Sequence, residues 1–173
     1  MPLSIAGLNS QKIKLLANKE FKDILIKNKH YFNQNIACLL KFTQENTKYI
    51  GHVVISYLDG IKSAILWYRQ LWSESLGKGK NNIHFMHAYG SEDQHSQLQM
   101  WLDGPNNLIY TIIMLKKRKN DYLIKDKKSV FPSFMKNKFL GEIFNTMAEA
   151  TATELIKAKR PVRIIYLDND NLE

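Results

Sequence analysis

The fold is decided by residues 67–105, which read WYRQLWSESLGKGKNNIHFMHAYGSEDQHSQLQMWLDGP. This stretch contains the end of an amphipathic helix predicted over Ile61–Leu76, a short apolar strand over Ile83–Ala88 and a second helix over Glu92–Leu102. Ser91 is the expected N-cap of the second helix, because its hydroxyl can accept a hydrogen bond from a free backbone N–H. A helix, a strand and a helix in this order indicate an α/β unit.

The chain on both sides of this stretch continues the alternation of helices and strands. Because strands that alternate with helices pair in parallel, we predict an α/β fold: a three-layer α-β-α sandwich around a mostly parallel sheet. The most apolar strand is expected in the centre of the sheet. The further segments are helices over 9–25, 33–43 and 139–159, strands over 50–57, 108–115 and 162–167, and a long loop over 116–138.

Length and composition predict a single soluble domain over residues 1–173. The chain is 45% hydrophobic and 24% charged, which is close to the average for globular proteins. Cys38 is the one cysteine, so no internal disulfide can form, and the longest apolar runs are too short to cross a bilayer. We therefore predict a cytoplasmic protein with no membrane partner.

The chain carries a net charge of +9, which attracts anions such as a phosphate ester or a nucleic acid. The tightest basic run is Lys116–Lys119, and Arg118 is the one arginine in it. Nucleic-acid surfaces usually combine such charge with aromatic or bidentate arginine contacts. We interpret the run as part of a solvated loop, and we do not expect nucleic acid as the partner.

Gln70 and Glu74 are four residues apart on a predicted helix, so their side chains share one face and can contact one ligand. A carboxylate close to an apolar surface lined by tryptophan can serve as a general base. The alternative is an exposed glutamate near a helix end that has no chemical role.

His95 falls in the first turn of the next predicted helix. The positive end of a helix dipole disfavours a second positive charge, so the imidazole can be a proton acceptor or a hydrogen-bond partner. The alternative is a surface histidine held by Asp93 or Ser96. The other histidines form no ligand cluster, so we expect neither a metal nor a cofactor.

Four segments of the chain resemble the second half of bacterial glucose-6-phosphate isomerases. The resemblance implies a sugar-isomerase (SIS) domain, the C-terminal one of the family. It also implies an aldose–ketose isomerisation through a cis-enediol, which serves glycolysis and gluconeogenesis. The segments are Trp67–Lys78 (WYRQLWSESLGK), Asp93–Gln99 (DQHSQLQ), Asp103–Pro105 (DGP) and Arg160–Arg163 (RPVR).

The resemblance implies a role for each of the three candidate residues. Glu74 matches the base that carries a proton between C2 and C1 of the sugar. His95 matches the histidine that assists ring opening, which the family contributes across a dimer interface. Gln70 matches a glutamine near the substrate phosphate.

The resemblance also implies that parts of the family's chain are absent here at both ends. A family member begins with another sugar-isomerase domain, which carries a phosphate loop and an arginine that steadies the enediolate. It ends in a helical region with a lysine used in ring opening. We therefore expect a phosphosugar substrate, and either a homo-oligomer or a partner chain that supplies the first domain. The alternatives are a non-catalytic phosphosugar-binding remnant and a basic protein associated with nucleic acid.

Overall fold

The structure is a computed structural model, and it describes residues 9–25, 34, 48–79, 82–118, 120–125 and 131–169. The chain divides into two compact units, residues 1–45 and 46–173, and each is described by itself. The single domain predicted over residues 1–173 stays a prediction. The helix predicted over residues 33–43 lies, apart from Gln34, outside the described residues.

The first unit contains helix α2, Ser10–Leu25. Asn9 caps it, because its side-chain oxygen accepts a hydrogen bond of 2.9 Å from the backbone N–H of Lys12. The amphipathic pattern that predicted a helix from this point is therefore confirmed.

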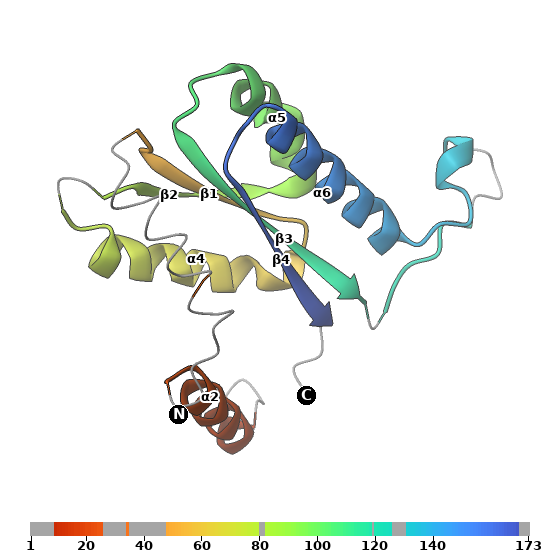
Figure 1. Ribbon diagram of the computed structural model, residues 1–173. Helices are drawn as coiled ribbons and strands as arrows, with labels where there is room; N and C mark the ends of the chain where they lie inside the picture. The colour runs from red at the N-terminus through yellow and green to blue at the C-terminus, as the bar shows by residue number, and fades with distance from the viewer. Residues whose placement is uncertain are drawn as a thin grey trace. The chain divides into compact units, whose positions relative to one another are not determined.

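The second unit is built on a sheet of four strands in the order β2-β1-β3-β4 (Figure 1). All three strand pairings are parallel, and the central strand β1 is buried at every position. The predicted α/β class, the parallel sheet and the central place of β3 are confirmed. The strands are β1, Gly51–Ser56; β2, His84–Tyr89; β3, Leu108–Lys117; and β4, Val162–Asn169.

The helices of the second unit cover both faces of this sheet. On one face lies α4, which a 3-10 turn precedes and a π-helical turn, η2, follows. On the other face α5 and α6 pack side by side on the main apolar core (Figure 1). The bounds are η1, Asp59–Ile61; α4, Lys62–Leu71; η2, Trp72–Leu76; α5, Gly90–Asp103; η3, Ser133–Met135; and α6, Leu140–Lys157.

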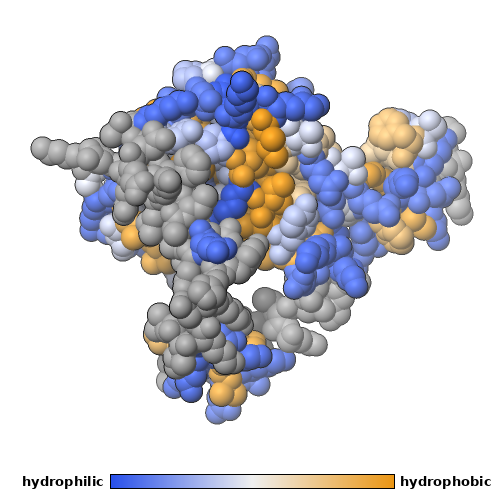
Figure 2. All heavy atoms as spheres, in the orientation of Figure 1, coloured by the Kyte–Doolittle hydropathy of each residue, from blue (hydrophilic) through white to orange (hydrophobic). Residues whose placement is uncertain are grey.

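The main core lies between the sheet and the α5–α6 pair. Strand residues such as Ile55 and Ile112 meet Trp101 of α5 and Leu155 of α6, and each of these four is at most 2% exposed. The segment predicted as a long loop is partly ordered, because β3 runs on to Lys117 and a bridge joins residues 123 and 139. Strand β4 forms one edge of the sheet, and hydrophobic atoms gather over its course (Figure 2).

The face of the sheet under α4 buries a polar pair. His52 is 0% exposed, and its Nε2 atom lies 2.8 Å from the hydroxyl oxygen of Thr111. The rings of Trp72 and Phe85 meet the imidazole edge-on. Burial, helped by the positive charge of Arg163, lowers the pKa of His52 to about 4.

This buried histidine makes the fold sensitive to acid. Between pH 6.5 and pH 4 the unfolded chain binds a proton at His52 that the folded chain does not, so stability falls as the pH falls. The shift corresponds to roughly 3 kcal/mol of unfolding free energy. We expect His52→Gln, which can still hydrogen-bond to Thr111 but does not titrate, to lose that much less stability than the wild type between pH 7 and pH 4. Urea unfolding of both chains measures it, and equal pH slopes would contradict this account.

Candidate functional site

Gln70 and Glu74 meet on the outer face of α4 and its π-helical extension. The side-chain amide of Gln70 donates a hydrogen bond of 3.0 Å to a carboxylate oxygen of Glu74, and both residues are exposed. The structure therefore brings these two predicted site residues together. Their roles toward a ligand stay a prediction.

Glu74 lies at the edge of the sheet where the strands begin. Trp72, two residues earlier, anchors the turn there, because its indole N–H donates a hydrogen bond of 2.9 Å to the backbone oxygen of Ile83. Ile83 directly precedes strand β2, and α4 runs back along the sheet from the end of β1. Parallel sheets usually bind ligands at their carboxyl ends, so Glu74 does not lie in the expected crevice of its own sheet.

His95 lies on helix α5, which begins at the opposite edge as soon as β2 ends. Because α5 begins at Gly90, His95 lies in its second turn, and the prediction of the first turn is wrong. The predicted cap at Ser91 is wrong. The helix begins at Gly90, and a carboxylate oxygen of Asp93 accepts the backbone hydrogen bond of Tyr89 at 2.5 Å. The start of the helix is therefore held by the Asp93 carboxylate, one turn inside the helix, and not by the Ser91 hydroxyl.

Contacts at both ends fix the position of the helix that carries His95. Near its start, the hydroxyl of Tyr57 lies 2.8 Å from both the side-chain oxygen of Gln94 and the hydroxyl of Thr151 in α6. At its end, the Arg160 guanidinium donates hydrogen bonds of 2.6 and 2.7 Å to the backbone oxygens of residues 102 and 104. Arg160 thereby joins the RPVR segment to the DGP segment, which are distant in the sequence.

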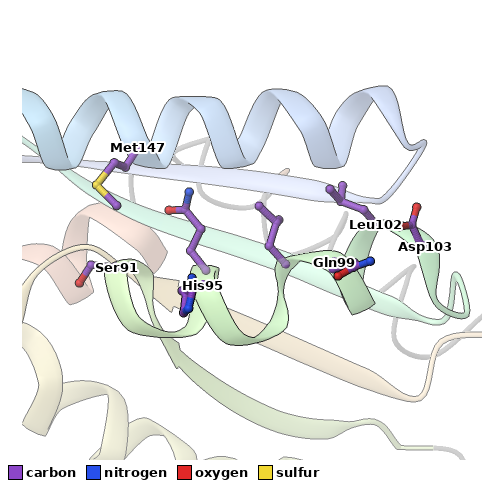
Figure 3. A pocket seen from close by; sticks show the side chains of 8 residues that line it. Ser91, His95, Gln99, Leu102, Asp103 and Met147 are labelled. Atoms are coloured by element: carbon purple, nitrogen blue, oxygen red, sulfur yellow. The ribbon is translucent and has the colours of Figure 1, made fainter. Parts of the chain in front are cut away.

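His95 lines an open groove of about 550 Å³ between α5 and α6 (Figure 3). Its imidazole is exposed, and amide, carboxylate and apolar side chains line the rest of the groove. Such a mixture can hold a polar ligand or a segment of protein. The lining residues are Ser91, Gln94, His95, Leu98, Gln99, Leu102, Asp103 and Met147.

The described chain does not bring Glu74 and His95 into one site. Glu74 belongs to the helix on one face of the sheet, at the amino ends of the strands. His95 belongs to a helix on the other face, at their carboxyl ends. The two predicted site residues therefore lie on opposite faces of the sheet within the described chain.

A smaller cavity of about 110 Å³ lies at the carboxyl ends of β1 and β2. Lys62 and Arg118 line it, together with the acidic residues Asp59 and Glu92. The sequence did not single out these residues as a group, because they come from three separate segments. Cations and carboxylates together favour no single type of ligand, and we assign none.

The interpretation of the basic run as a solvated loop is wrong for part of it. Arg118 is half-buried, donates a hydrogen bond of 3.3 Å to the backbone oxygen of Tyr57 and lies over the ring of Phe144. Lys116 forms an ion pair of 2.9 Å with Asp168. Arg118 therefore makes contacts within the fold, whereas Lys116 stays exposed to solvent at the end of β3.

The part of the chain that the structure describes contains neither a metal-binding cluster nor a membrane-spanning helix. No group of three or more His, Cys, Asp or Glu side chains there could hold a metal ion. Nor is any described helix long and apolar enough to span a membrane.

Comparison with solved structures places this chain among α/β proteins of known architecture. A hypothetical protein from Thermus thermophilus superposes with a TM-score of 0.84 at 25% sequence identity. The match covers 97% of this chain and 41% of the Thermus chain. The two proteins therefore share the fold over nearly the whole length of this chain.

Comparison with curated sequences shows that the chain is homologous to part of glucose-6-phosphate isomerase. It is 31% identical to the Campylobacter jejuni enzyme over 173 residues, which is 97% of this chain and 42% of the relative. It is 32% identical to the Rubrobacter xylanophilus enzyme over 127 residues, 69% of this chain and 29% of the relative. The resemblance predicted from the four segments is confirmed. No model of a protein family matches the chain.

The chain thus spans less than half the length of these relatives. The names of these relatives refer to complete enzymes. The described part of this chain holds Gln70 and Glu74 on one face of the sheet and His95 on the other.

The close approach of α5 to the sheet gives a test of how His95 is placed. A methyl group at Gly90 would overlap the ring of Tyr57, whereas one at Gly60 would meet nothing within 4 Å. We expect Gly90→Ala to lower the unfolding free energy by about 1–3 kcal/mol, because the helix must move to admit the methyl group. Gly60→Ala is the matched control, with a change within about 0.5 kcal/mol. Equal urea midpoints for the two variants would show that α5 does not rest on Tyr57.

Proposed function

We propose that this chain supplies the proton-transfer groups of a glucose-6-phosphate isomerase. The reaction interconverts glucose 6-phosphate and fructose 6-phosphate through a cis-enediol, a step of glycolysis and gluconeogenesis in the cytoplasm. The observation that carries the proposal is the Gln70–Glu74 pair, exposed on one helix face and held by a 3.0 Å hydrogen bond, in a homologue of these enzymes.

Glu74 is the proposed base. Its carboxylate takes the proton from C2 of the open-chain aldose, which leaves a cis-enediolate with its charge on O1. A proton passes from O2 to O1, and Glu74 returns its own proton to C1 to form the ketose. One carboxylate can reach both carbons because the enediol is planar. Gln70 orients the carboxylate through its side-chain amide and can turn toward the substrate phosphate.

His95 is the proposed group that moves a proton during ring opening. Because it lies at the other edge and face of the sheet from Glu74, the active site combines Glu74 of one chain with His95 of another. A homo-oligomer meets this need.

A partner chain is the other part of the proposal. The relatives are more than twice as long as the matched segment. The phosphate loop and the arginine that steadies the enediolate, which the resemblance implies, belong to that further length. A polypeptide that supplies them would complete the site.

A non-catalytic phosphosugar-binding protein is the second candidate function. The separation of Glu74 and His95 within one chain favours it, because a lone chain that binds a phosphosugar cannot apply both groups to it. The two functions differ in whether the chain, with its partner present, turns over the substrate and loses that activity when the Glu74 charge is removed.

The test is an isomerase assay of the chain alone and together with a polypeptide that covers the rest of a relative's length. We expect Glu74→Gln to lower kcat by about 100- to 10,000-fold, because the amide cannot accept the proton. Glu149→Gln, an exposed glutamate on α6, is the control and should leave kcat unchanged.

Binding of fructose 6-phosphate, measured by calorimetry on the same variants, separates the two functions. Binding without turnover in every combination of chains would favour the non-catalytic protein. Full activity in Glu74→Gln would remove Glu74 from the mechanism.

A further inference from the structure

The helix that carries Glu74 changes from α-helical to π-helical two residues before Glu74. Helix α4 ends at Leu71, and residues Trp72–Leu76 form a π-helical turn, which the N–H of Gly77 closes by bonding to the backbone oxygen of Trp72. π-helical turns are rare and are found mostly at functional sites, since the wider turn is less stable than an α-helical one. Something in the surrounding structure must therefore hold this turn open.

Trp72 is the residue of the turn that reaches into the protein. It is 7% exposed, whereas Ser73, Glu74, Ser75 and Leu76 are exposed. Its indole N–H donates the 2.9 Å hydrogen bond to the backbone oxygen of Ile83. Its ring packs against the rings of Tyr68, His52 and Phe85 at centroid distances of 6.1, 6.1 and 6.4 Å.

Gly77 allows the chain to leave the turn beside this indole. A Cβ atom at position 77 would lie 2.9 Å from the backbone oxygen of Trp72 and 3.2 Å from its ring atom Cδ1. The φ angle of Gly77 is −76°, which any residue can adopt, so the requirement for glycine is one of space. Trp72 therefore takes part in both contacts: its backbone oxygen accepts the hydrogen bond that ends the turn, and its indole anchors the turn to Ile83.

We propose that Trp72 is a positioning residue that sets the direction of the Glu74 carboxylate. Glu74 is exposed and two residues away, so its direction follows from the backbone of the turn. The hydrogen bond and ring contacts of Trp72 fix that backbone to the start of β2. This inference rests on the proposed role of Glu74 as the base.

The test compares Trp72→Phe with Trp101→Phe in the full chain. Phenylalanine at position 72 keeps an aromatic ring but cannot donate to Ile83. Trp101 is also buried, at 2% exposure, but it packs on Tyr110 on the other face of the sheet. The first readout is the NMR resonance of the Gln70 side-chain amide, because that amide bonds to Glu74.

We expect the Gln70 amide to shift and to exchange faster with solvent in Trp72→Phe, and to stay unchanged in Trp101→Phe. In the isomerase assay we expect kcat to fall about 10- to 100-fold in Trp72→Phe, with KM within about two-fold, because a small misplacement of a reacting group costs rate. The Trp101→Phe variant should keep its kcat even where it unfolds at lower urea.

Gly77→Ala gives the same test if Trp72→Phe fails to fold. The added methyl group presses on Trp72 from outside, and we expect the same shift of the Gln70 amide, with Gly60→Ala as the control. An unchanged Gln70 amide in both Trp72→Phe and Gly77→Ala would overturn the proposal, as would an equal loss of kcat in Trp101→Phe. If the wild-type chain has no isomerase activity with any partner, the proposed function fails. The Gln70 amide alone then decides whether Trp72 positions Glu74.

Discussion

The single direction of all four strands is the constraint on which the candidate site depends. After each strand the chain must return along the sheet before the next parallel strand can begin, and here helices make these returns. A residue at the start of a returning helix lies where the strands end. A residue at the end of such a helix lies where the strands begin. His95 is of the first kind and Glu74 of the second, so topology alone separates them within one chain.

Local patterns in the sequence were sufficient to predict the order of the α-helices and strands that the structure describes. The β-branched run at Val53–Ile55 marks a buried strand, and the side chain of Asn9 caps helix α2. The Gln70–Glu74 contact also follows from local spacing, because residues four apart on a helix share a face. Each of these features depends on residues that are close in the chain.

Contacts between distant residues could not be predicted in this way. Trp72, in the turn that carries Glu74, donates a hydrogen bond to the backbone oxygen of Ile83, across the linker that precedes β2. His52 is isolated from the other histidines in the sequence, yet it is buried against Thr111, which is 59 residues away. Arg118 lies in a run of basic residues, but its guanidinium bonds to the end of another strand. Only the packed structure brings these partners together.

The central claim is that Glu74 of one chain works with His95 of another. The most direct test mixes Glu74→Gln and His95→Gln chains, with the completing polypeptide present, and measures isomerase activity after the subunits exchange. Each variant alone should be inactive. A random mixture should recover about a quarter of wild-type activity, because half of the dimers are mixed and each mixed dimer holds one intact site of two. A mixture as inactive as its components, under conditions where the wild type is active, would contradict the claim.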